Sequence, residues 1–477
     1  MFPNVILIVI DALRYENVGY HGYPKPTTPN IDYLAEKSFV FTNAFATTNV
    51  TDPSITSLLS GKYPMNHGIT AHGPKVTDVH IKKFRNSETK LLQEILQENG
   101  YKTVGIDFLG RWHKNGFDQY LSERKKSVHK ILKRVSDKLC SLLGKESCIT
   151  NLIKIDKRNE RAQSKEDILR DYRCTQTAQN KIKKFIPQNT PFFLFLHFWG
   201  THIPYSPLNK FLDLFMRYNY RERPTLDEIL AETQGVWRER LERFTVDVNS
   251  TKEMLARYDA CIRCVDLMVQ KVITTLKRER LFENTIIILT SDHGESLTEH
   301  GIYFDHHGLY EESIHVPLII KFPDRGHKQI DSLVQHTDIL PTVLNYLNIN
   351  IENSIDGHPL IPYIKNKEDP REIIYTEEHH AQRKRSIRTK NYKYMYSPSK
   401  KDAICQYCGK IHGGQEELYD LVEDPDEEVN LEDSKPKVVK LFRKLLLTKV
   451  FNINKRNRFK ENVRGKLEIL RGRGELS

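Results

Sequence analysis

Two acidic residues and a histidine follow soon after apolar runs in this sequence. Asp11 directly follows the run 4–10, and Asp292 with His293 follows the run 285–290. Carboxylate oxygens and imidazole nitrogens are ligands for divalent cations. Such a cation neutralises a hard anion, such as phosphate or sulfate, and activates the nucleophile that attacks it. These residues therefore predict a metal centre that acts on an anionic ester.

The apolar runs indicate the elements that position these groups. The runs 4–10, 191–197 and 285–290 show almost no alternation, which is typical of strands buried on both faces of a parallel sheet. The segments 91–99 and 258–276 have apolar residues three and four positions apart, as helices do. This order predicts a doubly wound α/β sheet. Because functional groups collect at the carboxyl ends of such strands, three distant segments are expected to meet in one crevice.

Many further segments occur in a characteristic order. The first are Asn4-Val-Ile-Leu-Ile-Val-Ile-Asp-Ala-Leu-Arg14, Thr28-Pro-Asn-Ile-Asp32 and Thr51-Asp-Pro-Ser-Ile-Thr-Ser-Leu-Leu-Ser-Gly61. The later ones are Gly110-Arg-Trp-His113, Gly116-Phe-Asp118, His202-Ile-Pro-Tyr205, Ser291-Asp-His-Gly-Glu295, Leu309-Tyr-Glu-Glu-Ser313, Val316-Pro-Leu-Ile319, Glu417-Leu-Tyr-Asp-Leu421, Asp424-Pro425 and Asn430-Leu431. Together they resemble the sulfatase family of the alkaline phosphatase superfamily over almost the whole chain. The resemblance implies an alkaline phosphatase-like fold, with a doubly wound mixed sheet and a smaller C-terminal α+β subdomain.

The residue at the nucleophile position departs from the family signature. The signature has a cysteine or serine that is oxidised to formylglycine, whereas this sequence has Thr51. Oxidation of a threonine would give a ketone, so no formylglycine is expected. Relatives elsewhere in the superfamily use an unmodified threonine held on the metal. The resemblance thus implies that Thr51 is both the nucleophile and a metal ligand beside Asp11, Asp292 and His293. The structural alternative is that Thr51 is a helix N-cap, and both roles can hold together because a helix N-terminus also favours a bound anion.

Two more departures bear on the identity of the metal. Ile55 stands where the signature has an arginine, and Ala12 stands where the family has a second N-terminal aspartate. Sulfatases hold calcium with several carboxylates and a carboxamide. A site with one fewer carboxylate and an added imidazole, from His293, suits a softer ion. We therefore predict one divalent cation, manganese or zinc, with calcium and magnesium as alternatives.

The resemblance also implies roles for basic side chains. Arg111 stands where the family often has a lysine, and we predict that it binds the substrate anion. His113 and His202 occupy positions that in sulfatases touch the ester or the nucleophile, so both are predicted to be catalytic. His306 and His307 lie where many relatives carry a lysine that faces the leaving group. We predict a catalytic role for His306 and substrate binding for His307, with a second metal or simple packing as alternatives.

The charge balance is consistent with an anionic substrate. The formal net charge is +11 and the sequence pI is about 9.0. Such a chain attracts phosphate or sulfate esters, lipid headgroups and nucleic acid, and the motifs favour a small-molecule, glycan or lipid ester over a specific nucleic acid. The sequence shows no apolar run long enough for a membrane helix and no basic export signal before the run 4–10. A cytoplasmic protein is therefore expected, with peripheral contact to a membrane as an alternative.

Seven cysteines with irregular spacing predict free thiols rather than a disulfide framework. Cys261 and Cys264 lie in a helical pattern and are expected to pack. Cys405, Cys408 and His412 have the spacing of the first half of a zinc knuckle. No fourth ligand is evident nearby, so the spacing alone does not establish a metal site.

The pattern of elements divides the chain into three parts. Residues 1–345 form the predicted catalytic domain, with a basic helical insertion at about 114–184 that is either a cap or a solvated face. Residues 346–435 form a C-terminal subdomain with strands expected near 373–375 and 392–396. The basic tail 436–477 has Val438, Leu441, Phe442 and Leu445 at helical spacing. This helix is predicted to pack against the body, with an anionic membrane as the alternative partner.

Three functions remain consistent with these residues. The first is hydrolysis or transfer of a phosphate-type ester, a phosphodiester or phosphomonoester, through a covalent intermediate on Thr51. The second is sulfuric ester hydrolysis without formylglycine. The third is noncatalytic binding of anions or membranes. The first is preferred because an unmodified threonine suits phosphoryl chemistry, while fold resemblance alone does not separate the first two.

Overall fold

The computed structural model describes residues 2–122, 161–185, 190–221, 223–324, 326–350, 355–365 and 371–453. Its main sheet has eight strands in the order β4-β3-β5-β1-β6-β7-β2-β8. Their bounds are Asn4–Ile10 (β1), Phe39–Phe45 (β2), Lys102–Ile106 (β3), Gln119–Leu121 (β4), Phe192–Phe198 (β5), Thr285–Ser291 (β6), Leu318–Lys321 (β7) and Lys328–Gln335 (β8). Only β7 runs antiparallel to its neighbours, β6 and β2. The predicted mixed sheet is therefore confirmed.

The three strands predicted from apolar runs form the centre of this sheet. β1 pairs in parallel with β5 on one side and with β6 on the other. Every residue of these three strands is buried. Since both faces of each strand pack against apolar side chains, the sequence has no polar alternation there.

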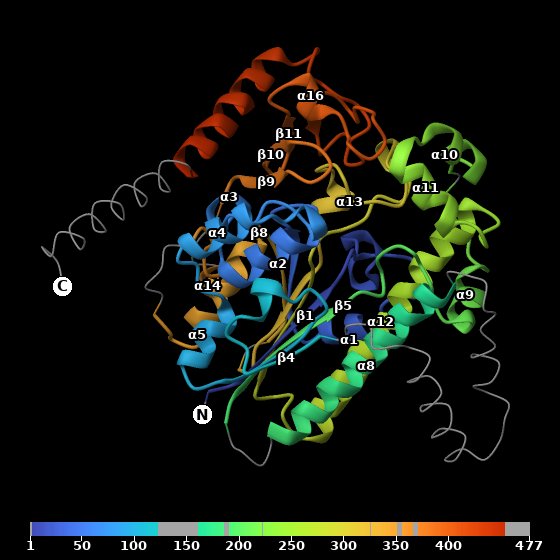
Figure 1. Ribbon diagram of the computed structural model, residues 1–477. Coiled ribbons are helices and arrows are strands. Elements are labelled where there is room, and N and C mark those ends of the chain that lie inside the picture. The colour runs from blue at the N-terminus through green and yellow to red at the C-terminus, as the bar shows by residue number, and fades with distance from the viewer. Residues whose placement is uncertain are drawn as a thin grey trace, which may run out of the picture.

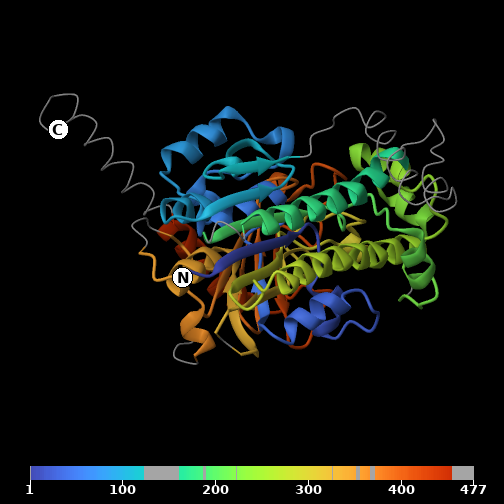
Figure 2. The ribbon, with the colours of Figure 1, turned by 90° about the horizontal axis from the view of Figure 1, so that it is seen from below.

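Helices cover both faces of the sheet (Figures 1 and 2). On one face, the even-numbered side chains of β1 pack in a core with α1 (Pro29–Ala35), α8 (Arg161–Phe185) and α12 (Thr251–Arg278). On the other face, the odd-numbered ones pack with α2 (Thr51–Ser60), α5 (Leu92–Glu98) and α14 (Ile339–Tyr346). The two helices predicted from sequence correspond to α5 and to most of α12.

The segment 114–184 is only partly an insertion. Residues 123–160 of it lie outside the described residues. The described remainder includes β4 at the edge of the sheet and the long helix α8. Ala178 and Ile182 of α8 are buried in the core with α12. This part of the segment thus belongs to the body of the domain rather than forming only a solvated face.

The C-terminal subdomain contains a second sheet of four antiparallel strands in the order β12-β11-β10-β9. The strands are Ile374–Glu378 (β9), Lys384–Arg388 (β10), Tyr392–Tyr396 (β11) and Glu416–Asp420 (β12). Figure 1 shows this subdomain above the ends of the central strands, on the side where α2 begins. The two strands predicted from sequence correspond to β9 and β11.

A helix at 436–453 packs against this second sheet. Val439, Phe442, Leu446 and Val450 are buried in one cluster with side chains of β9 to β12. Leu441 was predicted to lie on the buried face of this helix, but its side chain is 54% exposed. The buried face is formed by the residues at 439, 442, 446 and 450 instead. The packing prediction is confirmed for this helix, and the rest of the tail lies outside the described residues. Among the described helices, none is both long and apolar enough to cross a membrane.

Candidate active site

The site begins where the three central strands end. The register pairs Val9 of β1 with His197 of β5, and Ile10 with Ser291 of β6. Asp11 directly follows β1 and Asp292 directly follows β6. The two residues therefore lie side by side at the end of the sheet. Asp11, His197 and Asp292 are all buried, and ligand atoms from the three lie within 4.8 Å of one another. The ends of the central strands thus bring these side chains together, as expected.

The Nε2 atom of His293 lies at the centre of the four residues predicted to bind metal. It is 3.4 Å from Thr51 Oγ1, 3.4 Å from Asp292 Oδ2 and 3.7 Å from Asp11 Oδ1. His293 Nδ1 lies 2.7 Å from the Gly294 carbonyl oxygen, so Nδ1 carries the proton and Nε2 presents a lone pair. Burial lowers the pKa of His293, which keeps the ring neutral. A neutral Nε2 accepts either a metal ion or the Thr51 hydroxyl proton.

The two carboxylates lack partners that would explain their burial. Within the described part of the chain, neither oxygen of Asp11 has a hydrogen-bond partner, nor has Asp292 Oδ2. Burial and the charge of Asp292 raise the pKa of Asp11 well above its usual value. Two buried carboxylates are costly unless a cation compensates them. Donor atoms around an ion with bonds of about 2.1 Å lie roughly 3–4 Å apart, which matches these distances. The residues therefore fit one divalent cation.

His197 is a candidate ligand that the sequence analysis left out of the metal set. Its Nε2 lies 3.6 Å from Asp11 Oδ2, and its Nδ1 lies 2.9 Å from Asp107 Oδ1. Asp107 directly follows β3, the next strand of the sheet. A carboxylate behind an imidazole fixes the ring and is common around bound metals. Burial opposes protonation, but Asp107 outweighs it and raises the pKa of His197. The sequence did contain a signal for this ligand, since His197 is the last residue of the apolar run 191–197.

Thr51 is the first residue of α2, and every residue of that helix is buried. The N-cap position belongs to Val50, whose φ is −139° and ψ 145°. The alternative interpretation of Thr51 as an N-cap is therefore wrong. The Thr51 hydroxyl instead faces His293, and the helix N-terminus behind it favours a bound anion.

Asp52, beside Thr51, is held by two basic side chains that come from outside α2. Arg111 Nη2 lies 2.6 Å and His72 Nδ1 3.0 Å from Asp52 Oδ2. Burial alone would raise the pKa of Asp52, but His72, His113 and Arg111 hold it well below its usual range. Arg111 thus approaches Thr51 through Asp52, and its predicted contact with substrate stays a prediction. Nothing in the sequence motif marked Asp52 as the partner.

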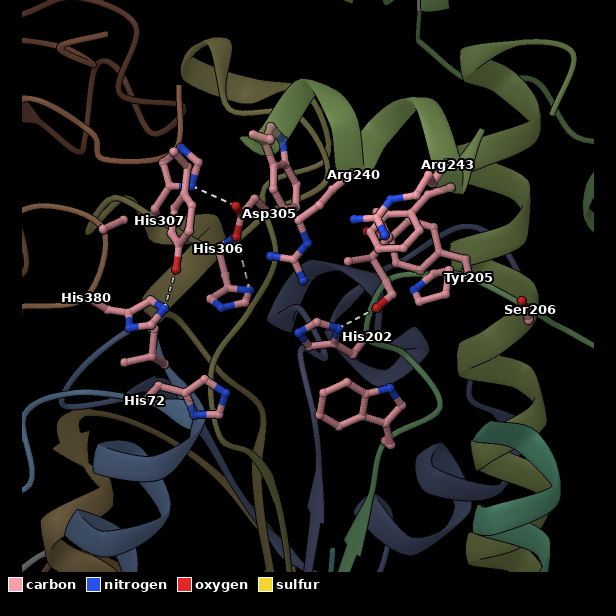
Figure 3. Close-up of a pocket in the computed structure, with 18 of the residues that line it drawn as sticks. His72, His202, Tyr205, Ser206, Arg240, Arg243, Asp305, His306, His307 and His380 are labelled. Atoms are coloured by element: carbon pink, nitrogen blue, oxygen red, sulfur yellow. Dashed lines mark hydrogen bonds and ion pairs between the residues drawn. The ribbon is translucent and has the colours of Figure 1, made fainter. Parts of the chain in front are cut away.

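Two of the predicted catalytic histidines border a cavity of about 950 Å³ (Figure 3). The His306 ring centre lies 4.2 Å from that of His293 and 5.4 Å from that of His202. Burial lowers the pKa of His202 to about 4 and that of His306 well below its usual value. Both rings are therefore neutral near pH 7. His202 Nδ1 donates to the Ile203 carbonyl oxygen at 2.7 Å, which leaves Nε2 as an acceptor.

The opposite wall of the cavity comes from regions that the sequence analysis did not connect to the site. Arg240 and Arg243 extend from α11 (Gly235–Phe244) toward the cavity (Figure 3). His72, His380 and Tyr407 also line it. This wall is rich in basic and aromatic side chains, which suits an anionic substrate.

The two remaining predicted residues are His113 and His307. His113 is fully buried, with Nε2 3.3 Å from Thr56 Oγ1 and 3.4 Å from the Asp52 carbonyl oxygen, so it contacts neighbours of Thr51 on α2. His307 borders the cavity, but its Nδ1 lies 3.0 Å from Asp305 Oδ2. The ring of its neighbour His306 lies against that of His293, whereas His307 lies beside Cys405 and Cys408 of the C-terminal subdomain. The roles predicted for both residues stay predictions.

The mixed sheet and the smaller antiparallel sheet together form an alkaline phosphatase-like fold, with the candidate site at the ends of its central strands. The chain belongs to the sulfatase family. Residues 3–349 match the family described as Sulfatase, and residues 298–454 match the one described as N-sulphoglucosamine sulphohydrolase, C-terminal.

The relatives agree with this assignment. The chain is 26% identical over 442 residues to an ulvan-active sulfatase of Formosa agariphila, covering 90% of this chain and 77% of the relative. Its structure is similar to that of a 2-O GAG sulfatase, with a TM-score of 0.69, 20% identity and coverage of 96% and 94%. It is equally similar to a phosphonate monoester hydrolase of Agrobacterium radiobacter, with a TM-score of 0.69, 20% identity and coverage of 94% and 96%.

Proposed function

We propose that this sulfatase-family hydrolase cleaves or transfers a phosphate-type ester through a covalent intermediate on Thr51. The observation that carries the proposal is the 3.4 Å approach of Thr51 Oγ1 to His293 Nε2, beside two buried carboxylates without sufficient partners. A threonine hydroxyl is a poor nucleophile unless a cation or a base favours its alkoxide. Asp11, Asp292 and His293 provide the ligands for that cation, and His197 is a fourth candidate.

The proposed reaction consists of two displacements at phosphorus. First, Thr51 Oγ1 loses its proton and forms a bond to phosphorus as the bond to the leaving oxygen breaks, and the leaving oxygen takes up a proton. Then water or an acceptor alcohol loses a proton and bonds to the same phosphorus as the bond from phosphorus to Oγ1 breaks, and Oγ1 takes up a proton to restore the Thr51 hydroxyl. A bound divalent cation supplies charge neutralisation at the hydroxyl and the phosphoryl oxygens.

Protons in this scheme pass through the histidines of the cavity. His202 and His306 have neutral rings, because burial lowers the pKa of each. His202 presents Nε2 as an acceptor, since its Nδ1 donates to Ile203. We propose that the two rings relay protons between Thr51, the leaving oxygen and water rather than store one at neutral pH.

Manganese or zinc is the proposed cation. The donor set contains imidazole nitrogen from His293 and, as a candidate, from His197. Calcium and magnesium prefer oxygen ligands, whereas manganese and zinc accept imidazole beside carboxylate. Restoring activity to chelated protein with each of the four cations tests this choice.

Sulfate ester hydrolysis without formylglycine is the second candidate. It is favoured by the relatives, several of which are named sulfatases, including one described as ulvan-active. Arg240 and Arg243 at the cavity suit a sulfated as well as a phosphorylated glycan or lipid. The two candidates differ in the atom that Thr51 attacks.

A comparison of substrates with matched variants tests the proposal. Wild type, Thr51→Ala, Thr51→Ser and the control Thr42→Ala would be assayed with an aryl phosphate, an aryl phosphodiester and an aryl sulfate. Thr42 lies on β2, where its hydroxyl bonds the Ile330 carbonyl oxygen. We expect a phosphate-type ester to be preferred, a loss of about a thousand-fold in kcat/KM for Thr51→Ala, and retention in Thr51→Ser and Thr42→Ala. A preference for the sulfate would select the second candidate.

A further inference from the structure

Four metal-binding side chains meet at the junction of the catalytic domain and the C-terminal subdomain. They are His307, Cys405, Cys408 and His412, and all four are buried. One ligand atom from each lies within 4.8 Å of those of the other three, and Cys408 Sγ is 3.1 Å from His412 Nε2. We propose that these residues bind a structural zinc ion, separate from the cation of the active site.

The backbone around the two cysteines has the shape of a zinc knuckle. The Gly409 amide donates to the Cys405 carbonyl oxygen at 2.8 Å, and the Cys405 amide donates to that of Lys410 at 2.8 Å. Gly409 has a φ of +72°, a conformation that favours glycine. Ile404 and Ile411 close the loop through an antiparallel bridge. This tight turn directs both sulfur atoms of the Cys-x-x-Cys pair to one side.

The two histidines are oriented as zinc ligands are. His412 Nδ1 lies 3.0 Å from the His300 carbonyl oxygen, which fixes the proton on Nδ1 and leaves Nε2 beside Cys408. His307 Nδ1 lies 3.0 Å from Asp305 Oδ2, and the ring is within hydrogen-bonding reach of the Cys405 and Cys408 thiols. A carbonyl or carboxylate behind the ring is the usual support of a metal-bound histidine.

The donor set itself selects zinc. Two cysteine sulfurs and two imidazole nitrogens form the closed tetrahedral arrangement typical of structural zinc. This set contains sulfur and no carboxylate, whereas the active site contains carboxylates and no sulfur. Cys405 and Cys408 carry free thiols in this structure, so a disulfide does not account for their approach.

The proposed ion joins two parts of the cavity wall. His307 is adjacent to His306, whose ring lies against His293. Tyr407 lies between the two cysteines, lines the cavity and shares a hydrogen bond of 2.5 Å with His380 Nε2. Zinc at the junction would therefore fix both the His306 loop and the Tyr407 side of the cavity. This inference does not depend on the reaction proposed for Thr51.

Cobalt substitution tests this site in the full-length protein. Protein produced in cobalt-supplemented minimal medium would be examined by absorption spectroscopy, because a cysteine thiolate gives cobalt an intense near-ultraviolet charge-transfer band. The active site offers no cysteine, so cobalt bound there gives no such band. We expect the band in wild type and in Asp11→Asn. Cobalt-loaded wild type without the band would overturn the proposal.

Variants and zinc release provide the second part of the test. Cys408→Ser should lose the band, while Cys264→Ser should keep it, because Cys264 is a buried cysteine of α12 outside the cluster. If Cys408→Ser fails to fold, wild type still decides: a mercurial reagent should release one zinc ion per chain as it titrates the thiols. No zinc release from protein purified under reducing conditions would contradict the inference.

Discussion

The two walls of the candidate active site were encoded in different ways. The strand-end wall, with Asp11, Asp292 and His293, comes from short segments that directly follow buried strands. The opposite wall, with Arg240 and Tyr407, comes from a surface helix and from a loop of the C-terminal subdomain. In the proposed function, the first wall supplies the groups for chemistry and the second surrounds the substrate. The comparison teaches that groups directly following buried strands can be recognised in the sequence, whereas a wall built from a helix and a loop is recognised only in the fold.

The largest effect should follow from damage to the strand-end wall. Asp292→Asn keeps the shape of the side chain but removes one of the two buried charges opposite His293 Nε2. We expect a fall in kcat/KM of about a thousand-fold and a matching loss of bound cation, measured by steady-state kinetics and elemental analysis. Asp331→Asn, at an exposed side chain on β8, is the control. Full activity of Asp292→Asn without metal would refute the metal-dependent mechanism.

The sequence revealed much of the first wall for a physical reason. Strands buried on both faces require continuous apolar runs, so β1, β5 and β6 were visible together with the residues that end them. Arg111 and His113 were also found, but their contact with Asp52 depends on how α2 packs beside η4 (Arg111–Lys114). Local sequence carries no signal for such a contact.

The second wall and the proposed zinc cluster could not be predicted from apolar runs in the sequence. His307 and the cysteine knuckle are distant in sequence and meet only because the subdomain docks over the strand ends. The half-motif of Cys405, Cys408 and His412 was visible, but its fourth ligand was not. The face of the helix at 436–453 was misplaced at Leu441 because helical spacing permits neighbouring faces, and docking selects one.

The next largest loss of activity should follow from a substitution of His306, which lies at the boundary between the two walls. His306→Asn removes the ring that lies against His293 and borders the cavity. We expect kcat to fall about a hundred-fold, with a smaller change in KM, because a proton relay acts mainly in the transition state. His379→Asn, at a partly exposed ring that bonds Glu377, serves as the control. A change in KM alone would mean that His306 only binds substrate.

A third prediction concerns stability beneath the strand-end wall. His336 is 1% exposed, and burial lowers its pKa to about 4, from an ordinary 6.5. The folded protein thus favours the neutral ring, so the stabilising contribution is present above pH 6.5 and is lost as the pH falls from 6.5 to about 4. At pH 5 the loss should be about 2 kcal/mol in the free energy of unfolding.

Denaturant unfolding between pH 7 and 4.5 measures this contribution. His336→Asn should flatten the decline in stability with falling pH relative to wild type, whereas the exposed control His327→Asn should not. An unchanged slope in His336→Asn would show that other groups cause the acid sensitivity.

The smallest effect should come from the second wall alone. Arg240→Ala removes a guanidinium that extends toward the cavity, so KM for an anionic ester should rise about ten-fold while kcat changes little. Arg238→Ala on the same helix is the matched control, since Arg238 is exposed and pairs with Glu242. A ten-fold loss in kcat instead would place Arg240 in the chemistry and weaken the division between the walls.

The most direct test of the covalent mechanism is the mass of the peptide that contains Thr51. Wild type would be mixed with an aryl phosphate, quenched in acid during turnover, digested and analysed by mass spectrometry, with Thr51→Ala treated in parallel. The account predicts a phosphoryl group on Thr51 in wild type and no phosphopeptide from the variant. Turnover with the phosphoryl group on another residue, or undiminished turnover by Thr51→Ala, would contradict it.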